Sequence, residues 1–234
     1  MTTLAFAVAA AAGNLAGALA VIRRLEGSLR AIDLGIAFSA GFMLSVALLG
    51  VLPEVFAQGD ASAAAYVLAG YLAVHVAQHV LAPHFHFGEE THPVSAFAGL
   101  AALVGLAVHT FFDGVAIAAG FLSSSKLGLL LALSVLLHKL PEGVTVASLM
   151  VAGGHGRRGA IAAAGVVGLA TVLGVLLTEA VAPLARHGLA LSAGVTLYVA
   201  ASELVPAFQS RRRSVATLAF AGGIATFLAA NLLV

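Results

Sequence analysis

Two short patterns in the sequence pair a histidine with a carboxylate four residues later. His109 precedes Asp113 in the stretch HTFFDG, and His138 precedes Glu142 in the stretch HKLPEG. On a helix, residues four apart leave the same face one turn apart. Two such faces would bring together two imidazoles and two carboxylates, a ligand set that suits Zn²⁺ and also accepts Fe²⁺, Mn²⁺ or Cd²⁺. These four residues are therefore the candidates for a divalent-metal site.

The residues around the pairs bear on how such a site would be built. Pro141 lacks a backbone N–H, so we expect the carbonyl of Leu137 to be free to meet water or an ion beside the site. Gly114 and Gly143 would let neighbouring backbones approach closely. An alternative is that the four ionisable groups are paired buried charges that cross-link two helices, or a proton relay.

The elements that must position these residues are membrane helices. The chain is 61% hydrophobic and 9% charged, with a mean hydropathy of +1.08, and its apolar stretches have the length that spans a hydrocarbon core. Eight spans are predicted, at about 4–22, 34–57, 63–82, 95–122, 127–152, 159–182, 189–208 and 214–233. The predicted fold is all-α, a polytopic bundle forming a single transmembrane domain over residues 1–234. The N-terminal stretch carries no basic residue, which argues against a cleaved signal.

Positive charges fix the expected orientation. Arg residues gather in the loops after the first, fifth and seventh spans, whereas the loops on the other side carry only Lys126 and Arg186. The positive-inside rule then places the Arg-rich loops in the cytoplasm and both termini outside. The loop at about 83–94 falls on the cytoplasmic side and contains His84, His86 and His92. It would either hold metal transiently or be a solvated polar loop.

The second and seventh spans share a further pattern. Each carries a proline near a glutamate, in Pro53-Glu54 and in Glu203-Leu-Val-Pro206. This similarity favours two halves related by inverted topology, a known transporter design. The chain has no cysteine, so neither a disulfide nor a thiolate metal site is available.

At these motifs the sequence resembles the ZIP family of metal transporters, over the whole chain. Family members have eight helices, outside termini, a His-rich loop 3–4, and H-N-x-P-[DE]-G and H-[DE]-x-P-[HE] type motifs in helices four and five. The resemblance implies a carrier that moves a divalent ion, zinc above all, across the plasma membrane toward the cytoplasm. It also implies a homodimer, with the lipid bilayer as partner. Residue usage rich in Ala, Gly, Arg and Leu fits a bacterium, in which the plasma membrane is the inner membrane. We expect no organic cofactor, no enzymatic activity and no nucleic-acid partner.

Three positions depart from the family pattern, and all three bear on the number of metal ions. Thr110 stands where the family often has Asn, Lys139 where it often has an acidic residue, and Thr171 where many bacterial relatives have Glu. These positions resemble those that form a second, bridged metal site in two-metal members, so we expect one metal. The Lys139 ammonium would occupy the place of the missing ion, or alternatively its side chain would snorkel outward.

Further residues are candidates for the transport path. Met43 aligns with a helix-two position that meets the metal in similar proteins, although a Met on an apolar helix also serves packing. His75 and His79 share a face of helix three, and would either lead toward the cytoplasm or bond another helix. Glu54 and Glu203 lie near helix ends, where a carboxylate at an interface needs no special function, although either could guide cations at a mouth of the path.

An enzyme is the alternative to a transporter. The same ligands could hold zinc in an intramembrane hydrolase that activates water. The sequence has no H-E-x-x-H pattern, and all four candidate groups are used as ligands, which leaves no convincing general base. Transport is therefore the favoured interpretation.

Overall fold

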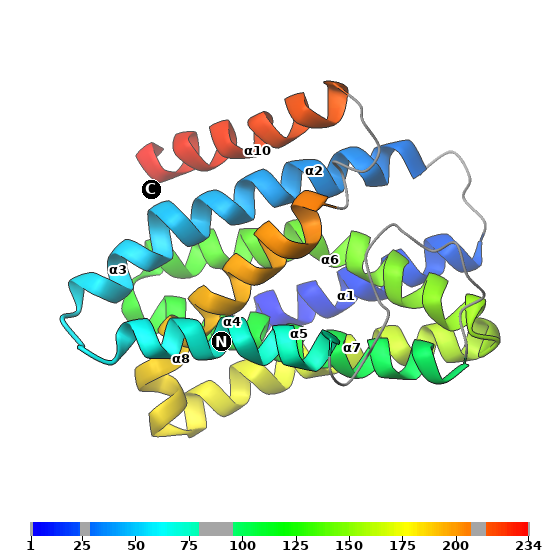
Figure 1. Cartoon of the computed structure of the whole chain (residues 1–234), viewed down its shortest axis with the longest axis horizontal. Helices are drawn as coiled ribbons and strands as arrows, with labels where there is room; N and C mark the ends of the chain where they lie inside the picture. Colours follow the sequence, from blue (N-terminus) through cyan, green and yellow to red (C-terminus); the bar gives the residue numbers. More distant parts are fainter. Residues whose placement is uncertain (1, 24–28, 80–95, 207–213, 234) are drawn as a thin grey trace.

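The chain folds into a helical bundle whose helices run mostly along its long dimension (Figure 1). The computed structural model describes residues 2–23, 29–79, 96–206 and 214–233, and no strand occurs among them. The helices are α1 (Thr2–Ile22), α2 (Leu29–Ser45), η2 (Val46–Val51), α3 (Leu52–Ala57), α4 (Ala63–His79), α5 (Ala96–Ser123), α6 (Ser125–Ala152), α7 (Gly156–Ala180), α8 (Ala182–Tyr198), η3 (Val199–Leu204) and α10 (Ser214–Leu233). The all-α prediction is confirmed.

Because η2 and α3 continue α2, and η3 continues α8, the described residues form eight rods, one for each predicted span. Six are long and apolar enough to cross a membrane, and Ala63–Gln78 is a shorter apolar helix. The remaining rod, α8 with η3, carries Arg186 and His187 in its first two turns. The chain is thus a multi-pass membrane protein.

The boundaries of the seventh rod and the placement of two charges differ from the sequence prediction. α8 begins at Ala182 rather than at about 189, because Pro183 suits the first turn of a helix and only Val181 separates α8 from α7. Lys126 and Arg186, expected in loops, lie in the first turns of α6 and α8. The connections at this end of the bundle are therefore shorter than predicted.

The second and seventh rods, which carry Pro53 and Pro206, each contain one turn of π-helix. In η2 and η3 the closing hydrogen bonds reach five residues back, from Leu52 N–H to the Ala47 carbonyl and from Val205 N–H to the Ala200 carbonyl. A proline follows directly in each case, Pro53 and Pro206. Such wide turns accommodate the missing proline N–H and locally re-aim side chains.

Helix contacts repeat in the two halves of the molecule. The pair α1 and α6 matches the pair α7 and α5, and the pair α2 and α10 matches α8 and α4. In each pair a glycine lies against a backbone carbonyl of its neighbour, so that no Cβ would fit: Gly143 against Asn14, Gly114 against Thr171, Gly41 against Phe220, and Gly194 against Val67. These equivalent contacts also make His109 and Asp113 the counterparts of His138 and Glu142. The halves therefore follow one inverted plan.

Contacts between distant parts of the sequence define one end of the bundle. Ser123 donates a hydrogen bond to Glu54, Thr3 donates to Glu179, and Lys126 donates to the Asn231 carbonyl. In Figure 1, α10 ends on the same side as the turn between α3 and α4. The beginning of α1 and the end of α10 thus lie at the end that carries the turns after α3, α5 and α7.

Candidate metal centre

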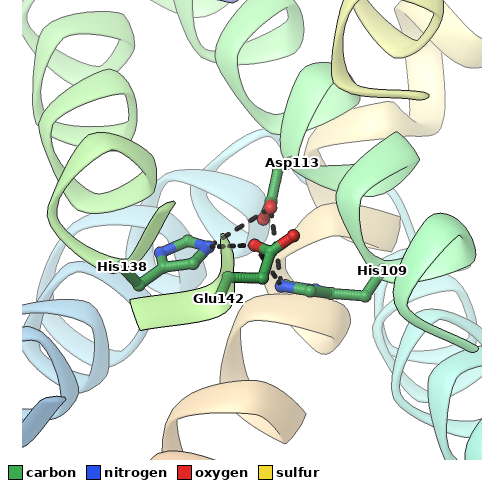
Figure 2. Close-up of side chains that lie close together, drawn as sticks. All are labelled: His109, Asp113, His138 and Glu142. Atoms are coloured by element: carbon green, nitrogen blue, oxygen red, sulfur yellow. Dashed lines mark hydrogen bonds and ion pairs between the residues drawn. The ribbon is translucent and has the colours of Figure 1, made fainter. Parts of the chain in front are cut away.

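The two His and carboxylate pairs meet in the interior of the bundle. His109 and Asp113 come from α5, His138 and Glu142 come from α6, and each side chain is at least 95% buried. Figure 2 shows the four groups turned toward one another from the two helices. One ligand atom from each residue lies within 4.8 Å of the other three.

The four distances between the imidazole nitrogens and the carboxylate oxygens lie near the ligand-to-ligand spacing of a four-coordinate ion. His138 Nε2 lies 3.2 Å from Asp113 Oδ2 and 3.7 Å from Glu142 Oε2, while His109 Nε2 lies 3.5 Å and 3.9 Å from the same two oxygens. Four ligands bound at 2.0–2.2 Å would stand about 3.4 Å apart in a tetrahedral site. The arrangement is thus compatible with a four-coordinate divalent ion after small side-chain adjustments.

The orientation of His138 favours a cation between these groups. His138 Nδ1 lies 2.9 Å from the carbonyl of Ser134, and a carbonyl only accepts, so Nδ1 carries a proton. In the neutral ring, Nε2 therefore presents a lone pair to the Asp113 carboxylate. Two lone pairs at this distance repel unless a proton or a metal ion lies between them. A backbone carbonyl on the far nitrogen is also the usual way of orienting a histidine ligand.

Lys139 lies inside the site. Its side chain is fully buried, and its Nζ donates to Asp113 Oδ2 at 2.6 Å and to Glu142 Oε2 at 2.8 Å. These are the same two oxygens that face the imidazoles. Each oxygen would therefore stand between the ammonium and a bound ion. The side chain does not snorkel outward.

The other two positions that depart from the family pattern are also buried. The Thr110 hydroxyl donates to the Ala107 carbonyl one turn back in α5. The Thr171 hydroxyl in α7 has no hydrogen-bond partner among the described residues. Neither residue offers a carboxylate, so Lys139 provides the charge that faces Asp113 and Glu142 in this part of the bundle.

A small cavity adjoins the candidate metal centre. It is lined by Leu106, His109, His138, Pro141, Glu142, Val199, Glu203 and Leu204. Glu203 is buried in η3 and is hydrogen-bonded by Gln78 of α4, but its Oε1 has no partner in the part of the chain described. The wide turn of η3 thus brings a carboxylate to the same cavity as three of the four candidate ligands. The sequence placed Glu203 at a mouth of the path, whereas it lies deeper, at 8% exposure.

The remaining candidates are not members of the four-residue cluster. Met43 packs in an apolar cluster with Val195, Tyr198 and Val199, next to residues that line the cavity. His75 is exposed on α4 with its ring edge against Tyr198. Glu54 accepts the Ser123 hydroxyl at the opposite end of the bundle.

Several predicted residues lie where the structure describes less. His79 ends α4, and its side chain lies outside the described part. The whole His-rich segment at about 83–94, with His84, His86 and His92, lies outside the described residues. Their proposed contact with metal therefore stays a prediction.

One expectation about the site is wrong. The carbonyl of Leu137, which Pro141 was expected to leave free for water or an ion, accepts a hydrogen bond of 2.9 Å from the Ser39 hydroxyl of α2. Sequence reasoning missed Ser39, because 98 residues separate donor and acceptor. The signal available in the sequence was Pro141, because a proline inside a helix leaves the carbonyl four residues earlier without its usual N–H donor.

Comparison with known families extends these observations. A family model described as ZIP zinc transporter matches residues 89–231, more than half of the chain, and both His and carboxylate pairs fall within the match. No curated protein matches the chain. The resemblance inferred from the motifs is confirmed at the level of the family.

Proposed function

Because this chain belongs to the ZIP zinc transporter family, we propose that it carries zinc across the membrane through a single site made by His109, Asp113, His138 and Glu142. Membership of the family implies transport of a divalent metal. The finer proposal names the ion, the residues that hold it, and a net movement toward the cytoplasm. Fe²⁺, Mn²⁺ and Cd²⁺ are further substrates that the same ligand set would accept.

The observation that carries the proposal is the buried set of two imidazoles and two carboxylates whose ligand atoms all lie within 4.8 Å of one another. Ionisable groups are expensive in a membrane core and normally mark a pathway or a site. With neutral histidines and a charged Lys139, the set carries one net negative charge. A divalent ion would reverse this charge to one positive, so its binding is weaker than in a site with two uncompensated carboxylates. Moderate affinity suits a carrier, which must release its ion.

The cavity beside the ligands supports a direction for the path. Glu203 and Gln78 lie on η3 and late in α4, at the ends of rods that lead to the Arg-rich side. We place the cytoplasm on that side by the distribution of positive charge. In this proposal the ion passes from the four ligands to Glu203, and then past His75 and His79 toward His84, His86 and His92. Glu54, at the opposite end, would attract cations from outside, and Met43 would contact the ion from α2.

The proposal includes the setting in which transport occurs. We infer a bacterial inner membrane with both termini extracytoplasmic, and a homodimer as the working unit. Alternating access would come from movement of one group of helices against the other, for which the repeated contacts of the two halves provide equivalent hinges. The chain would need no organic cofactor.

Uptake by proteoliposomes tests the proposal. Purified protein in sealed vesicles should accumulate Zn²⁺ faster than empty vesicles, and a panel of Fe²⁺, Mn²⁺ and Cd²⁺ at several pH values would rank the substrates. Absence of uptake for every ion, with metal-dependent cleavage of a peptide or lipid instead, would favour the hydrolase interpretation. A mutant vesicle preparation carrying Glu142→Ala controls for leakage.

A further inference from the structure

Ser39 connects the candidate metal centre to a helix that contributes none of the four clustered ligands. It lies in α2, is 1% exposed, and its hydroxyl is 2.9 Å from the Leu137 carbonyl of α6 and 2.7 Å from the Gly35 carbonyl of its own helix. Pro141 has no N–H, so the Leu137 carbonyl lacks its usual α-helical donor. An unpaired carbonyl in a membrane core is costly, because the lipid offers no hydrogen-bond donor. The Ser39 hydroxyl has one proton, which the Leu137 and Gly35 carbonyls share, and through it the Leu137 carbonyl gains a donor from α2.

The other half of the molecule provides an internal comparison. Ser192 holds the place in α8 that Ser39 holds in α2, since it follows Leu191 and precedes Gly194 as Ser39 follows Phe38 and precedes Gly41. The Ser192 hydroxyl donates only within its own helix, to the Leu189 carbonyl at 3.0 Å.

The hydrogen bonds of Ser39 and Ser192 differ because of Pro141. In α5 the counterpart of Pro141 is Phe112, which keeps its N–H, so the carbonyl of Val108 needs no outside donor. Both serines are equally buried, at 1% exposed. The hydroxyl therefore reaches across to a neighbouring helix only in the half where proline has removed the backbone donor.

The Leu137 carbonyl belongs to the peptide group that precedes His138. Fixing this carbonyl fixes the plane of that peptide, and with it the Cα and Cβ of His138. The imidazole ring of His138 is held by the hydrogen bond between its Nδ1 and the Ser134 carbonyl. Without Ser39, the turn that carries His138 would have one anchored end and one unpaired carbonyl.

We propose that Ser39 is a positioning residue for the metal site, which holds the Leu137–His138 peptide so that His138 Nε2 points at the ion. The inference depends on the proposed function, because it assigns His138 to the metal. Partners that orient a metal ligand typically change affinity about 10-fold to 100-fold when they are removed. Ser39 should have such an effect although it does not touch the ion.

A double-mutant cycle with Pro141 tests this role. Ser39→Ala should weaken Zn²⁺ binding by about 10-fold or more, measured with purified protein by competition with a chromophoric chelator. Ser192→Ala, the matched variant in the other half, should change the affinity by less than about 2-fold, because its hydroxyl serves only its own helix. In a Pro141→Ala background the new backbone N–H supplies the Leu137 carbonyl, so adding Ser39→Ala should cost nothing further.

The visible spectrum of bound Co²⁺ gives a readout that general destabilisation would not change. Ser39→Ala should alter the ligand-field bands, and the double variant should match Pro141→Ala alone. Equal losses from Ser39→Ala in both backgrounds, or an effect of Ser192→Ala as large as that of Ser39→Ala, would overturn the inference. If Ser39→Ala alone does not fold, the comparison of Ser39→Cys, whose thiol donates weakly, in the two backgrounds decides in the same way. Failure of the parental protein to bind Zn²⁺ through His138 would instead reject the proposed function.

Discussion

At the scale of single residues, the role of Lys139 decides how many ions the core would hold. Its ammonium contacts one oxygen of Asp113 and one of Glu142, and those oxygens also face His109 and His138. An ion among the four ligands and the ammonium of Lys139 would therefore share two bridging oxygens. This arrangement is compatible with the prediction that one fixed charge takes the place of a second metal.

The first prediction concerns the ligands themselves. His109→Ala and Glu142→Ala should each reduce Zn²⁺ uptake to the level of empty vesicles, because each removes one of four groups that replace the hydration shell of the ion. Glu179→Ala is a matched control, since Glu179 is a carboxylate that hydrogen-bonds Thr3 at the end of the bundle. Thermal unfolding of each purified variant checks the fold. Near-parental uptake by the two ligand variants would reject the site.

The second prediction concerns stoichiometry. Titration of the purified protein should show one Zn²⁺ per chain in the core, because the Lys139 ammonium repels a second cation. Two like unit charges 4 Å apart repel by about 4 kcal/mol at an effective dielectric near 20. Changing Lys139→Asp together with Thr171→Glu should add a second binding event without removing the first. Two ions in the unaltered core would contradict the role given to Lys139.

At the scale of the helices, close packing at glycines holds α5 and α6 in place. Gly174 of α7 lies against the Phe111 carbonyl of α5, so a Cβ there has no room. Gly165 of the same helix has open space around it. The two glycines thus provide a matched pair for testing how far the site depends on helix approach.

The third prediction uses this pair. Gly174→Ala should destabilise the folded protein by roughly 1–3 kcal/mol, the usual range for inserting a methyl group into a packed interior. Gly165→Ala should leave stability unchanged or raise it by up to about 1 kcal/mol, because its methyl group meets no neighbour and Ala favours the helix more than Gly does. The unfolding midpoint in detergent measures both effects. Equal midpoints would show that α5 and α7 can separate slightly without cost.

The helices show which features could be predicted from sequence. The spacing of His109 with Asp113 and of His138 with Glu142 defines a shared face, and apolar length defines most spans. The start of α8 was missed because Arg186 and His187 lower local hydropathy, although Pro183 marks a helix start. The Ser39 contact could not be predicted, because it depends on how α2 lies against α6. The spacing of residues within one helix can be predicted from the sequence alone. Contacts between residues far apart in the sequence depend on how the helices pack.

At the scale of the whole molecule, the inverted plan places the candidate metal centre where the two halves meet. α5 and α6 are each other's counterparts, so each half contributes one histidine and one carboxylate. The two halves differ at residues in and beside the candidate metal centre. Lys139 and Pro141 have Thr110 and Phe112 as counterparts, and Glu203 of η3 has Gly50 of η2. The interior of the bundle is therefore polar around Glu203 of η3 and apolar around η2, where Val46 and Val51 pack with Leu130 and Phe227.

The last prediction concerns the orientation of the bundle in the membrane. The chain has no cysteine, so single Cys variants can be labelled without background. Ala61, in the turn between α3 and α4, and Ala152, which ends α6, are both exposed and lie at opposite ends of the bundle. The end near Ala152 carries Arg157 and Arg158 in the first turn of α7, so the positive-inside rule places it in the cytoplasm.

An impermeant maleimide should therefore label Ala61→Cys in spheroplasts, and Ala152→Cys only after the membrane is opened. Both changes are Ala to Cys at exposed positions, so folding and thiol reactivity are closely matched. The reverse pattern would place the termini inside, and the polar cavity at Glu203 would then open outward. In that case the same ligands would load from the cytoplasm, and the proposed direction of transport would have to be reversed.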